Sequence, residues 1–258
     1  MKAIKSVVQY TIKIVGNSLA VKKIEYKDKP FLINYDIVNS SKDRAIVFLH
    51  GWGSNKEIMK QAFSKKLRDF KHIYIDMPGF GRSFNEHILD TKDYKNIVKL
   101  FLDELSITDD LTVVGHSFGG KVATLLEPKN LVLLSSAGIL ETKSAKTLLT
   151  IRMAKIFNRF GLGKVTKLLR SKDVDNMSQN MYETFKNVVD EDFSEEFKKF
   201  QNSCLIFWGE QDQSTTLDSG KTIASLIKNN KFFSYDGDHY FFIKNSDDIA
   251  KKIEENII

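Results

Sequence analysis

Short apolar runs alternate with amphipathic stretches along this 258-residue chain, and this alternation constrains the fold more than any other feature. The runs are rich in β-branched and aromatic residues, which is typical of strands covered on both faces. They lie at 45–49, 72–75, 111–115, 131–135, 204–208 and 231–235. Helical periodicity marks the stretches 56–70, 91–105, 217–228 and 246–257, with Asp90 or Thr91, and Ser246, as expected N-caps. The pattern predicts an α/β protein with a mostly parallel central sheet flanked by helices.

Two segments near the amino terminus stand apart from this alternation. Residues 21–26 and 31–37 predict a hairpin, because 27–30 supplies turn residues and Pro30 interrupts pairing. Residues 1–23 form an extension of uncertain structure, since their apolar residues fit both a strand and a helical stripe. Gln9 and Lys13 interrupt the apolar region that a secretory signal would need.

Residues 141–200 also break the alternation, because helical stretches follow one another there with no strand-like run between them. An all-helical insertion in an α/β core is typical of a lid or cap. We therefore expect a core of residues 1–140 and 201–258, with a helical cap at 141–200 inserted after the sixth core strand.

The segment 115–119 reads Gly-His-Ser-Phe-Gly, directly after a predicted strand and before a helix-like stretch. This is the context that a Gly-x-Ser-x-Gly nucleophile elbow requires. The tight turn projects the hydroxyl of Ser117 above the sheet, and the start of the following helix favours a developing oxyanion.

A serine hydroxyl needs a general base at neutral pH, and the chain offers five histidines. His116 neighbours the serine and should point away from it, His50 precedes a glycine-rich turn, His72 begins a strand and His87 lies in a polar loop. His239 follows the last predicted strand, at the edge where Ser117 also lies. His239 is therefore the expected base.

A carboxylate must orient this imidazole, and Asp212 follows the penultimate strand at the same edge. Glu210 is the near competitor, whereas Asp236 and Asp238 are too close to His239 in sequence to turn back easily. The chain order Ser117, Asp212, His239 is the order expected of this elbow motif.

Backbone N–H groups should stabilise the tetrahedral intermediate of such a reaction. The run 50–53, His-Gly-Trp-Gly, follows a predicted strand and can turn the N–H of Trp52 toward the carbonyl oxygen. Paired with the N–H of Phe118, it forms the expected oxyanion hole.

Together these segments, with Asp-Met-Pro-Gly-Phe-Gly-Arg-Ser at 76–83, resemble the α/β-hydrolase superfamily over residues 24–140 and 201–258. Within it, the Trp52 and 76–83 segments resemble small capped esterases, among them pimeloyl-carrier-protein methyl ester esterases, and meta-cleavage C–C hydrolases. The resemblance implies an α/β-hydrolase fold. The helix after the elbow is shorter than is usual in the family.

We therefore expect a serine hydrolase that cleaves a carboxylic ester or thioester through an acyl-enzyme, with no metal and no cofactor. Hydrolytic C–C cleavage of a dienoate ring-fission product is the alternative within the fold, because the same triad serves it. A ligand-sensing protein on the same fold is the alternative of another class.

The net charge of +6 raises the question of an anionic partner. From 143 to 172 there are nine basic residues and no acidic ones, whereas 173–197 carries eight acidic residues and one lysine. The simpler interpretation of this charge-split cap is a solvated lid helix that the acidic stretch partly neutralises. The alternative is a basic face that receives an anionic partner, an acyl carrier protein or a lipid surface rather than nucleic acid. The single cysteine, Cys204, cannot form an internal disulfide, and no apolar run is long enough to span a membrane, so we expect a cytoplasmic protein.

Overall fold

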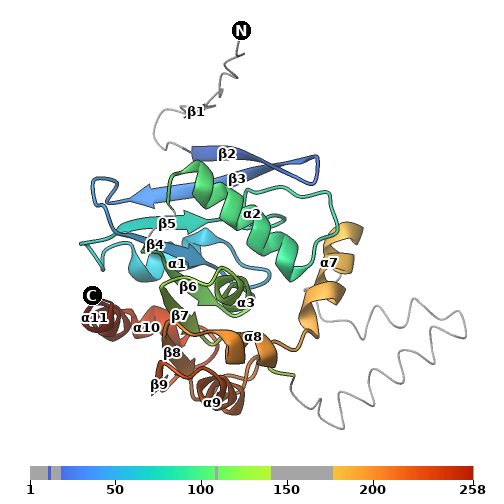
Figure 1. Ribbon diagram of the computed structural model, residues 1–258. Helices are drawn as coiled ribbons and strands as arrows, with labels where there is room; N and C mark the ends of the chain where they lie inside the picture. The colour runs from blue at the N-terminus through green and yellow to red at the C-terminus, as the bar shows by residue number, and fades with distance from the viewer. Residues whose placement is uncertain (1–10, 13–18, 108–109, 141–176, 258) are drawn as a thin grey trace, which may run out of the picture.

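The computed structural model describes residues 11–12, 19–107, 110–140 and 177–257 (Figure 1). Within these residues nine strands form one sheet in the order β1-β2-β3-β5-β4-β6-β7-β8-β9. The strands from β4 to β9 run parallel, whereas β1, β2 and β3 pair antiparallel and β3 joins the rest through β5. The predicted α/β class is confirmed. The strand bounds are β1 (Thr11–Ile12), β2 (Leu19–Tyr26), β3 (Lys29–Val38), β4 (Ala45–Leu49), β5 (Lys71–Ile75), β6 (Thr112–His116), β7 (Asn130–Leu134), β8 (Ser203–Gly209) and β9 (Asn230–Tyr235).

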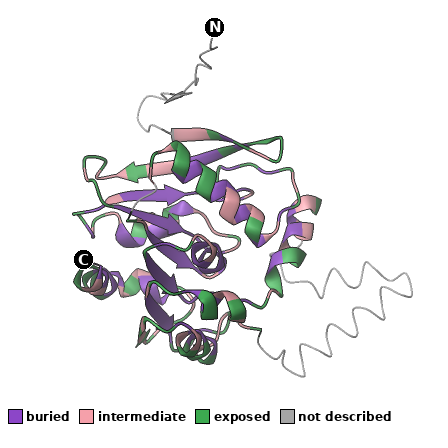
Figure 2. Ribbon diagram, in the orientation of Figure 1, coloured by how far each residue is buried: buried purple, intermediate pink, exposed green. Residues whose placement is uncertain are grey.

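Helices cover both faces of the sheet, and strands β4 to β8 are buried between them, whereas the edge strand β9 is only partly covered (Figure 2). In β4, Ile46 and Phe48 pack on one side, and Val47 and Leu49 on the other, as the period of two requires. The first side is covered by α1 (Lys56–Phe63), α10 (Phe241–Lys244) and α11 (Ser246–Asn256). The second is covered by α2 (Thr91–Glu104), α3 (Phe118–Leu125), α8 (Ser194–Lys199) and α9 (Leu217–Leu226).

The amino-terminal hairpin forms as predicted, with one difference at its turn. Lys27 and Asp28 have positive φ and make the turn between β2 and β3. Pro30 lies inside β3, opposite Glu25, rather than in the turn. Since β3 pairs with β5 only from Tyr35 onward, the missing N–H of Pro30 costs no ladder bond on that side.

Two helix boundaries differ from the sequence prediction. The helix predicted at 56–70 ends at Phe63. It could not have reached residue 70, because Leu67 adopts a φ of 50°, which an α-helix cannot continue through. Asp90 caps α2 as predicted, accepting from the N–H of Asp93 in a capping box. Ser246 is instead the first residue of α11, and Asn245 precedes it as N-cap without a side-chain capping bond.

Between β7 and β8 the described residues form two helices, α7 (Gln179–Val189) and α8. The remainder of the predicted cap, including all of the basic segment 143–172, lies outside the described residues. Among the helices that the structure does describe, none combines the length and apolar character needed to cross a bilayer.

Candidate active site

Ser117 occupies the sharp turn between β6 and α3. It is the N-cap of α3 with a φ of 51° and a ψ of −117°, a conformation that L-residues adopt only under strain. A Cβ at Gly115 would collide with the backbone of Gly119, and a Cβ at Gly119 would collide with the carbonyl of Leu49. The glycines of the motif therefore allow the close approach of β6, α3 and β4 that holds the half-buried Ser117 in this turn.

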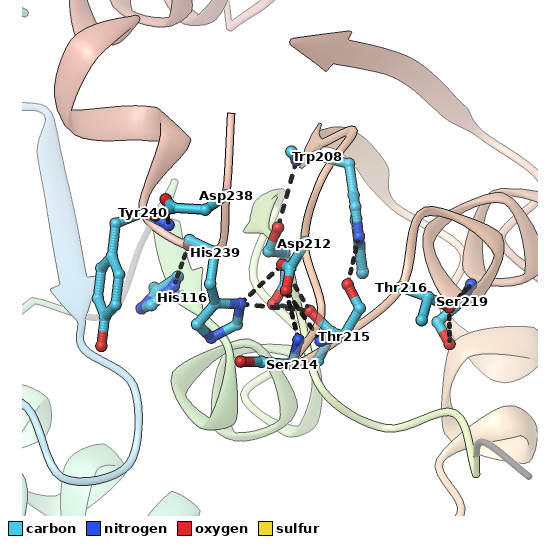
Figure 3. Close-up of polar contacts among 12 residues, drawn as sticks. His116, Trp208, Asp212, Ser214, Thr215, Thr216, Ser219, Asp238, His239 and Tyr240 are labelled. Carbon is cyan, nitrogen blue, oxygen red and sulfur yellow. Dashed lines mark hydrogen bonds and ion pairs between the residues drawn. The ribbon is translucent and has the colours of Figure 1, made fainter. Parts of the chain in front are cut away.

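Asp212 and His239 meet at the same edge of the sheet, from the loops that follow β8 and β9. The Nδ1–H of His239 donates to Oδ2 of Asp212 at 2.7 Å (Figure 3). Asp212 is buried, and its Oδ1 accepts from the N–H groups of Ser214 at 2.8 Å and Thr215 at 3.0 Å. The hydroxyl of Thr215 donates to the other oxygen at 3.0 Å. This network fixes both the carboxylate and the ring that it orients.

The surroundings of Asp212 keep it ionised. Burial by itself raises the pKa of this carboxyl group, but the hydrogen bond and charge of His239 and the N–H of Thr215 outweigh it, so the pKa lies below its ordinary value. A negative Asp212 fixes the proton of His239 on Nδ1, which leaves Nε2 free to accept one. The competitor Glu210 is exposed and accepts from the hydroxyl of Ser234 instead.

His116 contacts His239, which the sequence analysis did not anticipate. Its ring lies 4.6 Å from the ring of His239, and its Nε2 is 3.0 Å from the carbonyl oxygen of His239 (Figure 3). Burial, helped by the charge of His239, lowers the pKa of His116 to about 3. Because a carbonyl only accepts, this neutral ring carries its proton on Nε2 and holds the backbone of His239 in place.

The two residues of the expected oxyanion hole flank Ser117. A Cβ at Gly51 would lie 2.9 Å from the His116 ring and 3.1 Å from Cβ of Ser117, so the loop before Trp52 runs directly beside the serine. Phe118 is the first residue of α3, and its N–H is among those that no carbonyl of the same helix can satisfy.

Aromatic rings surround Trp52 next to this loop. Its ring centroid lies 4.8 Å from Phe80, 5.5 Å from Phe118 and 5.3 Å from Phe185 of α7. These four rings pack against one another and form an aromatic wall next to the loop that carries Trp52. Trp208, by contrast, is fully buried in the core and donates its indole N–H to the carbonyl of Thr215, which supports the Asp212 loop.

The buried carboxylate of Asp76 stabilises turns rather than the histidine. Its oxygens accept from the backbone N–H groups of Lys56 at 2.8 Å and Arg82 at 3.0 Å, and from the Lys56 ammonium group at 3.2 Å. His50 is likewise engaged, because its Nε2 accepts from the N–H of Met77. Both residues fix the loops that follow β4 and β5.

Comparisons with curated proteins find partial and full-length relatives. The pimeloyl-[acyl-carrier protein] methyl ester esterase of Pectobacterium carotovorum is 33% identical over 79 residues, which cover 31% of this chain and 29% of that protein. The biotin biosynthesis bifunctional protein BioHC of Teredinibacter turnerae is 32% identical over 115 residues, 40% of this chain and 19% of that protein. These matches thus span less than a third of either relative. The hydrolase YugF of Bacillus subtilis is 22% identical over 240 residues, covering 78% of this chain and 85% of that protein.

Solved structures share the fold over nearly the whole chain. An esterase from Exiguobacterium antarcticum superimposes with a TM-score of 0.71 at 18% identity, covering 91% of this chain and 98% of that one. A meta-cleavage product hydrolase from Pseudomonas fluorescens gives 0.64 at 20% identity, covering 91% and 96%. The family model described as the alpha/beta hydrolase family matches residues 46–248. The chain therefore belongs to the alpha/beta hydrolase family.

Proposed function

We propose that this protein is a serine hydrolase that cleaves a carboxylic ester or thioester of a small-molecule acyl compound through an acyl-enzyme. One observation carries the proposal: an ionised, buried Asp212 bonds the imidazole of His239 at 2.7 Å, at the sheet edge that carries the strained Ser117. A base oriented by a carboxylate at the same sheet edge as a strained, half-buried serine is an arrangement that can activate a hydroxyl.

In this mechanism Oγ of Ser117 attacks the acyl carbon while Nε2 of His239 takes its proton. Asp212 stabilises the imidazolium that forms, and the N–H groups of Trp52 and Phe118 hold the oxyanion. Collapse of the intermediate breaks the bond to the leaving alcohol or thiol, which receives the proton from His239. A water molecule, deprotonated by the same histidine, then releases the acid and restores Ser117.

The relatives named pimeloyl-[acyl-carrier protein] methyl ester esterase support ester cleavage. Because the matches cover less than a third of those proteins, the substrate is part of the proposal. An anionic partner, either an acyl carrier protein or a lipid surface, remains a proposal as well, because the basic segment 143–172 that suggests it lies outside the described residues. Reversing Arg152, Lys155 and Arg159 to Glu should lower turnover of a carrier-bound ester but not of a small ester. Equal loss on both substrates would refute that partner.

A fluorophosphonate probe tests the nucleophile directly. We expect the wild-type protein to be labelled and Ser117→Ala to lose labelling, because only an activated serine reacts with such a probe. Ser225→Ala, which removes an exposed hydroxyl on α9, is the matched control and should keep labelling. Folded wild-type protein that takes up no probe would refute the proposal.

Hydrolysis of a chain-length series of p-nitrophenyl esters separates the alternatives. We expect turnover that depends on acyl length, because the aromatic wall contacts the chain. Negligible rates across the series, with probe labelling retained, would favour C–C hydrolysis. Bleaching of a dienoate ring-fission chromophore would then identify that activity, whereas no turnover in either assay would favour ligand sensing.

A further inference from the structure

The proposed mechanism does not use Lys121, yet this lysine is almost completely buried. Its side chain is 2% exposed, and it lies on α3 three residues after Phe118. Removing an ammonium group from water is costly unless acceptors replace the lost hydration. The acceptors of Lys121 therefore indicate what the buried charge does.

These acceptors lie at the carboxyl end of α7 and just beyond it. Nζ of Lys121 donates to the carbonyl of Val188 and to Oε2 of Glu191, the latter at 2.9 Å. The last carbonyls of a helix lack partners within the helix and carry its negative dipole end, so a cation fits there. The hydroxyl of Thr91, the first residue of α2, donates to the same Glu191 oxygen. One ammonium and one carboxylate thus join α2, α3 and α7.

Aromatic faces complete the surroundings of this ammonium group. Nζ lies 5.0 Å from the ring centroid of Phe193 and 5.7 Å from that of Phe118. Both distances are within the range of cation–π attraction. Burial lowers the pKa of Lys121, against the hydrogen bond and charge of Glu191 that raise it.

Trp52, in the loop after β4, links the same two helices one turn away. Phe118 and Lys121 are three residues apart on α3, and Phe185 and Val188 are three residues apart on α7, so each pair shares a helix face. Trp52 contacts the rings of both Phe118 and Phe185. The bond from Lys121 to Val188 fixes where α7 lies relative to α3, and it thereby fixes the position of Phe185 against Trp52.

Other polar contacts hold α7 against a different part of the core. Thr184 accepts from the N–H of Leu89 at 3.0 Å, and the side chain of Asn187 donates to the carbonyl of Leu89 at 3.2 Å. These bonds attach α7 to the segment before α2, whereas Lys121 attaches it to the helix that follows the nucleophile. Loss of the lysine should thus shift α7 without releasing it.

We propose that Lys121 is a positioning residue that fixes α7 against the aromatic wall at Trp52. In this proposal the wall lines the acyl-binding part of the site, so that Lys121 sets the length of acyl chain accepted. The inference rests on the proposed ester hydrolysis. An apolar side chain of similar length would fill the same space without the desolvation cost. Unlike an apolar side chain, the lysine fixes the position and orientation of α7, because it bonds the carbonyl of Val188 and the carboxylate of Glu191 at one end of that helix.

The test compares Lys121→Met and Glu191→Gln with Lys99→Met, which removes a half-exposed lysine of α2 and serves as the matched control. In the p-nitrophenyl series, Lys121→Met should lower kcat/KM for the longest ester about tenfold relative to the acetate ester, mainly through KM. Amide hydrogen exchange in α7 should also quicken about tenfold. Glu191→Gln, which retains the shape of the side chain, should give smaller changes in the same direction.

Two outcomes would overturn the proposal. One is an unchanged chain-length profile in both Lys121→Met and Glu191→Gln, whatever happens to exchange. The other is exchange in α7 equal to that of Lys99→Met. If Lys121→Met fails to fold, Glu191→Gln decides alone. Wild-type protein that hydrolyses no ester would refute the proposed function instead, and exchange would still show whether Lys121 holds α7.

Discussion

Among single residues, Asp212 illustrates how position in the fold selects one carboxylate over its neighbours. Glu210 follows the same strand, but its side chain is exposed and bonded to Ser234. Asp212 lies two residues further, in a turn closed by the bond from its own N–H to the carbonyl of Gly209. That turn directs its carboxylate toward the N–H groups of Ser214 and Thr215 and toward His239.

Replacing this carboxylate should abolish most of the activity while leaving the fold intact. In Asp212→Asn the side chain has nearly the same shape but no charge, so it neither stabilises the imidazolium nor fixes its tautomer. We expect kcat on a p-nitrophenyl ester to fall by roughly 10³- to 10⁴-fold. Glu210→Gln is the matched control and should stay within about twofold of wild type. Equal losses in both variants would show that Asp212 has no special part.

The sequence could predict that Ser117, Asp212 and His239 lie at one edge of the sheet, because each follows a strongly patterned strand and parallel strands place their carboxyl ends together. The structure joins two of them, Asp212 and His239, by a hydrogen bond. It could not show the contact of His116 with His239. That contact depends on how closely the last loop folds back over the sheet: a Cβ at Gly209 would collide with the carbonyl of Asp238. Such an approach leaves no signal in local periodicity, since it joins segments more than a hundred residues apart.

At the scale of elements, the predicted bounds are accurate where every residue of the element is buried, and less accurate where they rest on the spacing of apolar residues alone. The strand β4 has the predicted bounds because all five of its residues are buried and bounded by turns. The helix α1 is shorter than its periodicity suggested, because Leu67 and Phe70 are buried from turns rather than from a helix. Apolar residues spaced every three or four positions indicate that these residues are buried. They indicate a helix only where the backbone dihedrals allow one.

The contribution of the α2 capping box to stability can be measured. Asp90 accepts from the N–H of Asp93 at 2.8 Å, while the carboxylate of Asp93 accepts from the N–H of Asp90 at 3.0 Å. Asp90→Ala should lower the free energy of unfolding by about 1 kcal/mol, measured by urea denaturation. Asp103→Ala, in the last turn of the same helix, removes only a surface pair with Lys99 and should change it by less than about 0.5 kcal/mol. A cost for Asp90→Ala no greater than for Asp103→Ala would contradict the capping role.

For the whole molecule, buried histidines determine how stability responds to acid. Burial lowers the pKa of His50 to about 4 and that of His116 to about 3, and it also lowers the pKa of His72. Each ring has a structural partner: His50 bonds Met77, His72 bonds the carbonyl of Leu67, and His116 bonds the carbonyl of His239. All three lie neutral within the core of the sheet and its helices.

A lowered histidine pKa makes the protein less stable as the pH falls. In the unfolded chain these rings bind protons below pH of about 6.5, whereas in the folded protein His50 and His116 do so only near their lowered values. Protonation therefore stabilises the unfolded state throughout this window. Between pH 7 and pH 5 each of these two residues should remove about 2 kcal/mol from the free energy of unfolding.

Denaturation by urea at half-unit steps from pH 7 to pH 5 measures this slope. We expect His116→Gln to flatten it by up to about 1.4 kcal/mol per pH unit, whatever its stability at pH 7, because one titrating group is gone. Val113→Ala, a core substitution without a titrating group, should lower stability equally at every pH and leave the slope unchanged. If His116→Gln instead shows the wild-type slope, His116 takes up its proton in the folded protein over this range. Its ring would then be charged, and its bond to the carbonyl of His239 would be stronger at pH 5 than at pH 7.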